Sequence, residues 1–99
     1  MSLTVELLPG AVADLEALAA QTGQYSAAAR TNLLVSIARK VQLLEKMPYM
    51  YPALLQRPHI RKCVVSATVS LYYRVQPNAI EIIGFADSRR DPETRDWSD

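Results

Sequence analysis

The apolar residues of this 99-residue chain change their spacing once, and this change limits the folds open to it. Between residues 11 and 47 they recur every three or four positions, as on one face of a helix. Between residues 60 and 86 they largely alternate with polar residues, as in a strand. Because 99 residues suffice for one hydrophobic core and not for two, both patterns must pack together. The spacing therefore predicts an α+β fold.

The first half of the chain predicts one strand and a helical hairpin. Residues 3–8 are apolar and β-branched, which favours a strand. A helix is expected over residues 11–23, with Asp14 in its first turns, where acids interact favourably with the helix dipole. A second helix is expected over residues 26–47, with Ser26 as its N-cap. The short connection between the helices predicts that they run antiparallel.

The second half predicts a three-stranded antiparallel meander. Its strands are expected at residues 60–65, 69–76 and 79–86. Asn78 lies in the last turn, where asparagine tolerates positive φ. With one face covered by the helical hairpin, the order is β-α-α-β-β-β and the sheet is twisted and mainly antiparallel. Residues 1–99 are accordingly interpreted as a single domain.

Two less regular segments flank the meander. Residues 48–58 contain three prolines and are expected to form an ordered but irregular crossover that Tyr49 and Tyr51 fix to the core. Residues 87–99 are expected to be a polar tail or a short helix, with an acidic N-cap followed by a proline at the first helical position. Trp97 is expected to fold back on the domain more readily than to dock on a partner.

Several functional classes find no support in the composition. No apolar run approaches the roughly 18 to 20 residues of a membrane span, and no positive charge precedes the first apolar residues as in a signal peptide. Cys63 and His59 are the only cysteine and histidine, so neither a metal site nor a cofactor is predicted. Cys63 is interpreted as a core residue and His59 as a rim residue. A lone cysteine is compatible with a cytoplasmic location.

The cations are distributed unevenly, although the net charge is only +1. Between Glu45 and Glu81 every charged residue is basic, which indicates either an anionic partner or a solvated basic face. An antiparallel meander places the arginines that follow its last strand at the opposite end from those that open its first strand, so two basic patches are expected. The candidate binding residues are Arg61, Lys62, Arg74, Arg89, Arg90 and Trp97.

The order of elements and three short stretches resemble the RelE/ParE superfamily of bacterial toxins, which belong to type II toxin–antitoxin pairs and are often labelled plasmid stabilisation proteins. The stretches are Ala-Val-Ala-Asp-Leu at residues 11–15, Tyr-Arg-Val at residues 73–75, and the arginine pair at residues 89–90. The resemblance extends from residue 5 to residue 92. It implies a helical hairpin on a mainly antiparallel sheet.

The resemblance leaves two main activities open. RelE-like members cut messenger RNA on the ribosome, and on that reading the catalytic groups would be Lys62, Arg74, Arg90 and His59. However, their central-strand arginine falls at Ser70 here, and their C-terminal tyrosine falls near Asp96 or Trp97, neither of which can act as the acid. ParE-like members instead bind DNA gyrase and block its cycle without chemistry of their own. The resemblance therefore favours the ParE-like branch, and enzymatic activity is left open.

The same resemblance implies the partners. A cognate antitoxin is expected in every case, with DNA gyrase as the target on the ParE-like reading and the ribosome with messenger RNA on the RelE-like reading. A degenerate, non-toxic member that only binds an antitoxin is the third alternative. The oligomeric state is left open, with a homodimer and a heterotetramer with the antitoxin as the alternatives, and no membrane partner is expected. An acidic antitoxin segment would suit the basic region, so charge reversal at Arg61 and Lys62 is expected to weaken its binding.

Overall fold

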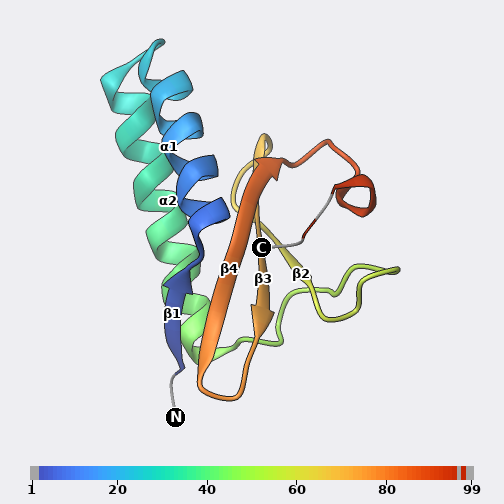
Figure 1. Cartoon of the computed structure of the whole chain (residues 1–99). Coiled ribbons are helices and arrows are strands. Elements are labelled where there is room, and N and C mark those ends of the chain that lie inside the picture. Colours follow the sequence, from blue (N-terminus) through green and yellow to red (C-terminus); the bar gives the residue numbers. More distant parts are fainter. Residues whose placement is uncertain (1–2, 96, 98–99) are drawn as a thin grey trace.

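The computed structural model describes residues 3–95 and residue 97, and it packs two helices on one face of a four-stranded sheet (Figure 1). The predicted order β-α-α-β-β-β and the antiparallel helical hairpin are confirmed. The elements are β1 (Thr4–Leu7), α1 (Pro9–Gly23), α2 (Ala27–Lys46), β2 (Arg61–Val64), β3 (Val69–Val75), β4 (Ala79–Asp87) and the 3₁₀ helix η1 (Pro92–Thr94).

A capping serine and a proline explain where the two helices begin. The side chain of Ser26 accepts a hydrogen bond from the backbone N–H of Ala29 at 3.0 Å and caps α2, as predicted. Helix α1 begins earlier than expected, because Pro9 occupies its first turn, where a proline ring already has the required φ. Asp14 therefore lies outside the first turn of α1, and the expectation that it stabilises the helix dipole there was wrong.

The strand order in the sheet is β1-β4-β3-β2. Strands β2, β3 and β4 form the predicted antiparallel meander, and β1 is added parallel to β4. Strand β1 is shorter than β4: its last residue, Leu7, lies opposite Ile82, so the second half of β4 has no strand neighbour on that side. Helix α1 lies beside this part of β4 (Figure 1), and the side chains of Asp14 and Arg95 contact its backbone.

A β-bulge interrupts the pairing of β3 with β4. Tyr72 lies opposite Gly84 and Tyr73 lies opposite Ile82, so Ile83 is an extra residue on β4. A bulge reverses the alternation of a strand beyond it, and Phe85 consequently joins the helix-facing core together with Ile82. Gly84 was the available sequence signal, since a glycine inside a strand often marks a bulge.

Both faces of the sheet bury apolar side chains. The helix-facing core contains Ala11, Ile37, Leu44, Cys63, Val69, Leu71, Tyr73, Ile80, Ile82 and Phe85. A smaller cluster on the other face contains Leu54, Ile60, Tyr72, Ile83 and Trp97. The polar alternation of the central strand suggested a mixed outer face, but the tail covers this face around Tyr72. Cys63 is a core residue, as predicted.

Two local expectations were wrong. Tyr51 packs against the helix-facing core and fixes the crossover, but Tyr49 is 65% exposed and does not. No non-glycine residue in the described part of the chain has a positive φ, so Asn78 does not adopt the left-handed conformation. The turn there is closed by a hydrogen bond from the Gln76 N–H to the Ala79 carbonyl, at 2.8 Å.

Candidate binding surfaces

Arg61 and Lys62 are adjacent in β2 but lie on opposite faces of the sheet, because side chains alternate along a strand. Arg61 Nη1 donates to the carbonyl of Tyr51 at 2.7 Å and to that of Tyr49 at 3.4 Å. Lys62 Nζ donates to the Ser88 carbonyl at 3.1 Å. The two cations therefore lie on different faces of the sheet and do not form one patch.

Two other candidate cations are neutralised within the chain. Arg74 pairs with Glu81 at 2.7 Å across β3 and β4, and Arg89 pairs with Asp87 at 2.7 Å. Hydrogen bonds from the Arg89 side chain hold the pKa of the Asp87 carboxyl well below its usual range. Arg90, which follows in the chain, is exposed, and none of the described carboxylates is hydrogen-bonded to it. Of the arginine pair, Arg90 is therefore the one that is not hydrogen-bonded to a carboxylate of the described residues.

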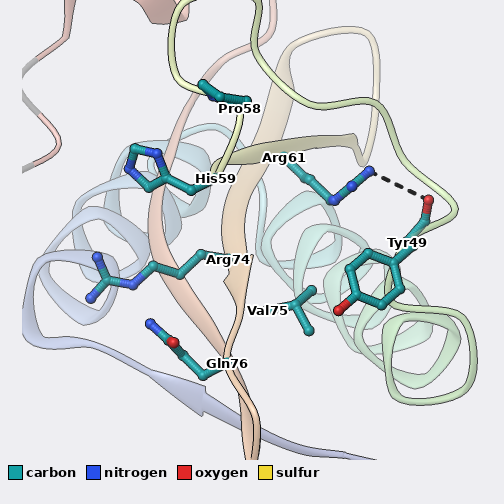
Figure 2. A pocket seen from close by; sticks show the side chains of 7 residues that line it. All are labelled: Tyr49, Pro58, His59, Arg61, Arg74, Val75 and Gln76. Carbon is teal, nitrogen blue, oxygen red and sulfur yellow. Dashed lines mark hydrogen bonds between the residues drawn. The ribbon is translucent and has the colours of Figure 1, made fainter.

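The first surface is a cavity of about 240 Å³ beside the end of β3, which we name the β3 notch. Its lining residues are Tyr49, Pro58, His59, Arg61, Arg74, Val75 and Gln76. Figure 2 shows His59, Arg74 and Gln76 on one side of Val75, and Arg61 and Tyr49 on the other. The guanidinium of Arg61 lies over the Tyr49 ring, 5.1 Å from its centroid.

The second surface is a cleft of about 770 Å³, which we name the tail cleft. Its walls are α1, the tip of the helical hairpin at Tyr25, the start of β3 and the end of β4. Arg89, Arg90 and Arg95 line the side formed by β4 and the tail, and Asp14 lines the side formed by α1. Since Arg89 is paired with Asp87 and Arg95 with Asp14, Arg90 carries the positive charge that remains in the cleft.

A three-residue contact, which we name the tail latch, joins the tail to α1 and β4. The Asp14 carboxylate accepts hydrogen bonds from the Phe85 N–H at 3.0 Å and from Arg95 Nη2 at 2.6 Å. Arg95 Nη1 donates to the Phe85 carbonyl at 3.0 Å. The bulge turns the backbone of Phe85 towards these groups, at a place where β1 has already ended. Two side chains thus satisfy the backbone groups that a neighbouring strand would otherwise pair.

Trp97 lies beside this latch and is only 6% exposed. Its ring centroid is 4.6 Å from that of Tyr72, and the guanidinium carbon of Arg95 lies 4.4 Å from the indole centroid. Its indole N–H donates to the Pro92 carbonyl at 2.9 Å. Trp97 therefore folds back on its own domain, as predicted, and it has little surface left for the partner contact also assigned to it.

The residues that a RelE-like ribonuclease would need are dispersed. His59 and Arg74 line the β3 notch, whereas Arg90 lines the tail cleft. These surfaces lie at opposite ends of the sheet, because Val75 pairs with Ile80 at one end of β4 and Val69 pairs with Asp87 at the other. Lys62 is held at Ser88, and the buried Ser70 hydroxyl is hydrogen-bonded to the Ser88 hydroxyl at 2.9 Å.

The described residues give little support for metal binding or for a reactive thiol. None of their His, Cys, Asp and Glu side chains form a group of three or more that could hold a metal ion. Burial raises the pKa of the Cys63 thiol, which disfavours the reactive thiolate. Within the described ranges, no helix is long and apolar enough to cross a bilayer.

Sequence reasoning missed Asp14, Arg95 and Val75 as residues of these surfaces. Asp14 was interpreted as a helix-dipole residue, and Arg95 was one charge among many in a polar tail. Their pairing links positions 81 residues apart, and no local pattern encodes it. Val75 was assigned only to the apolar face of its strand. Its exposed edge follows from the different lengths of β2 and β3.

Comparisons with known proteins agree with this architecture. A family model described as "ParE toxin of type II toxin-antitoxin system, parDE" matches residues 5–92. A structure titled "Chromosomal ParDE TA system from P. aeruginosa" is similar with a TM-score of 0.73 at 17% identity, covering 87% of this chain and 96% of that one. A conserved hypothetical protein of Helicobacter pylori, HP0894, is similar with a TM-score of 0.52 at 16% identity, covering 87% and 94%. No match is found among curated protein sequences.

Proposed function

Because this chain belongs to the ParE toxin family of type II toxin–antitoxin systems, we propose that it inhibits DNA gyrase by binding it and that a cognate antitoxin neutralises it. The family match extends over nearly the whole chain, and it is the observation that carries the toxin class. The target and the antitoxin are the parts proposed here.

The dispersal of the cations supports inhibition by binding over messenger RNA cleavage. A ribonuclease must gather its cations and its proton donor around one phosphate, because each contributes only within hydrogen-bonding reach of the reacting atoms. Here Arg90 and Arg74 line separate surfaces, and Ser70 offers a buried hydroxyl where the RelE-like enzymes keep an arginine. Trp97 is buried and its indole N–H is occupied, so it cannot replace a C-terminal acid.

Arg90 is the residue we propose as the gyrase contact. It is exposed, it follows β4 directly, and it is the cation of the tail cleft without a described carboxylate partner. An exposed guanidinium without a carboxylate partner in its own chain can bind a carboxylate or a phosphate bidentately. The tail latch keeps the neighbouring wall of the cleft in place, so that the charge is presented from a rigid surface.

The test is a supercoiling assay with purified gyrase, run beside a cell-free translation assay. We expect the protein to inhibit supercoiling and to leave translation unaffected, and we expect the antitoxin encoded by the neighbouring gene to reverse the inhibition. Arg90→Ala should weaken inhibition about tenfold, which corresponds to a loss of about 1.4 kcal/mol of binding free energy.

Arg39→Ala is the matched control, because Arg39 is an exposed arginine on α2, away from both surfaces. It should inhibit as the unmodified protein does, and both variants should unfold at the same temperature as the unmodified protein. Arrest of translation with intact supercoiling would overturn the gyrase proposal and restore the ribonuclease reading. Inhibition of neither process would favour a degenerate, antitoxin-binding protein.

A further inference from the structure

An open groove runs between the two helices of the hairpin, which lie side by side (Figure 1). We name it the hairpin groove. Its volume is about 440 Å³, and its lining residues are Leu15, Glu16, Ala19, Ala20, Arg30 and Leu34. It shares no lining residue with the tail cleft, which other residues of α1 line. A molecule bound in the hairpin groove therefore leaves Arg90 accessible.

Much of the hairpin groove is apolar. Leu15 and Leu34 are half-buried, and Ala20 is exposed. Val12, one turn before Glu16 on α1, is 40% exposed and extends this surface. Alanine side chains let a second helix approach closely, because the distance between packed helices depends on the side chains at their contact. The groove therefore presents a surface suited to packing against another helix.

The two charged residues of the groove have opposite signs and lie towards its two ends. The aliphatic stem of Arg30 lies against Gly23, since a Cβ atom added there would be 3.3 Å from Arg30 Cδ. Glu16 precedes Gly23 by seven residues of α1, which is roughly 10 Å along the helix axis. Within the described part of the chain, neither Glu16 nor Arg30 forms an ion pair. Each end of the groove thus carries one exposed charge.

We propose that the hairpin groove is the contact surface of a homodimer, in which two copies of this chain pack hairpin against hairpin. A twofold axis that crosses the middle of the groove at right angles to α1 exchanges the two ends of the groove. It brings Glu16 of each copy to Arg30 of the other, so the dimer forms two identical ion pairs. Ala19 and Ala20, which lie between these charges, pack near the axis, and the two hairpins form a four-helix arrangement.

The charges favour a second copy over a different partner. An acidic segment would pair with Arg30 but bring a like charge to Glu16, and a basic segment would do the reverse. A surface with one charge of each sign at its two ends is complementary to itself, as a twofold interface requires. The inference goes beyond the proposed function, because it involves neither the target nor the antitoxin.

The first measurement is the mass of the purified chain by sedimentation equilibrium over a wide range of concentrations. We expect a monomer–dimer equilibrium. Glu16→Arg and Arg30→Glu should each raise the dissociation constant at least tenfold, because each brings like charges together across the interface. The double variant, which carries both substitutions, exchanges the two charges. Its dissociation constant should return to within about threefold of that of the unmodified protein.

Arg39→Glu is the matched control for Arg30→Glu, because it makes the same charge change at an exposed residue of α2 outside the groove. It should change the dissociation constant less than twofold. Circular dichroism spectra of all the charge variants should match that of the unmodified protein. A double variant that dimerises as weakly as the single ones would mean that Glu16 and Arg30 do not face each other, and the proposed interface would be wrong.

A second comparison fills the groove. Ala20→Trp places a large side chain between the two charges, whereas Ala28→Trp places the same side chain at an exposed position of α2 outside the groove. We expect the first variant to dimerise at least tenfold more weakly, because the helices can no longer approach closely, and the second to dimerise as the unmodified protein does.

A chain that stays monomeric at every concentration would overturn the inference and leave the toxin proposal unaffected. A dimer that neither the charge variants nor Ala20→Trp weaken would also overturn it, because its contact surface would then lie elsewhere. If the chain is monomeric and the groove variants instead lose affinity for gyrase or for an antitoxin, the groove belongs to that partner and not to a second copy.

Discussion

In two places a strand of this sheet extends beyond the strand beside it. The backbone groups left there differ in whether the rest of the chain hydrogen-bonds to them. Strand β4 continues past the end of β1, and there the backbone of Phe85 is closed off by Asp14 and Arg95. Strand β3 continues past the start of β2, and there the backbone of Val75 is left open between Arg61 and His59. An exposed strand edge invites unwanted pairing, so a protein normally covers it. The tail latch covers one of these edges, and the end of β3 has no such cover among the described residues.

The largest expected effect comes from removing the hydrogen-bond partners of the Phe85 backbone at the edge of β4. Arg95→Ala removes the hydrogen bond to the Phe85 carbonyl, leaves the Asp14 carboxylate without its cation, and removes the contact with Trp97. We expect the free energy of unfolding to fall by about 2–3 kcal/mol, because a partly buried polar group loses its partner. The Phe85 amide should also exchange faster. Denaturant unfolding and hydrogen exchange measure the two effects.

Arg89→Ala is the control for that change, because Arg89 also pairs with an aspartate but does so at the surface. We expect no measurable change in its unfolding curve. Equal destabilisation by the two substitutions would mean that the tail latch contributes no more than an exposed ion pair, and the contrast between the two edges would then lose its energetic basis.

An intermediate effect is expected from adding a side chain at Gly84, which lies beside the tail latch. A Cβ atom at Gly84 would lie 2.9 Å from both Arg95 Nη2 and the Trp97 ring, and 3.0 Å from Asp14 Oδ2. Gly84→Ala should therefore displace the tail and lower the free energy of unfolding by about 1–2 kcal/mol. Trp97 fluorescence should shift to the red as the indole becomes exposed. In the control Gly10→Ala, whose Cβ would make only ordinary contacts, stability and fluorescence should be unchanged.

The smallest effect concerns the loop beside the open edge. The Tyr73 hydroxyl donates to the Pro48 carbonyl at 2.7 Å, and this bond holds the chain that leads to Tyr49 and the β3 notch. Tyr73→Phe should lower the free energy of unfolding at neutral pH by about 1 kcal/mol, the usual contribution of one hydrogen bond.

The same residue gives a dependence on pH. Burial raises the pKa of Tyr73 to about 12, above its ordinary value of 10.0. Because the unfolded chain loses this proton first as the pH rises, the stabilisation is complete below about pH 10 and is lost between about pH 10 and pH 12. Tyr73→Phe should flatten this alkaline decline, measured as the free energy of unfolding in urea at several pH values. Tyr25→Phe, at a tyrosine that is 84% exposed, should leave it unchanged.

What the sequence predicted well was encoded locally. The spacing of apolar residues in α2, the cap at Ser26, and the prolines and polar residues between the strands were enough to place the elements in order, since each depends on residues a few positions apart. The fold-back of Trp97 also followed from general experience with apolar residues near a chain end. The placement of β1 beside β4 was not foreseen, because parallel pairing joins segments with 71 or more residues between them.

The binding surfaces depended on relations that no local pattern contains. The identity and order of the arginines were visible in the sequence, and so was the superfamily that they resemble. Which of them remain charged towards solvent was decided by the acids that the fold brings next to them: Glu81 for Arg74 and Asp14 for Arg95.

By itself, then, the sequence determined two helices, a meander and a membership in a toxin family, because periodicity and short motifs are properties of neighbouring residues. Only the tertiary structure decided which strand edge is closed and which is open. That outcome depends on the relative lengths of paired strands and on a single bulge, and it becomes defined only when residues far apart in the chain are brought into register.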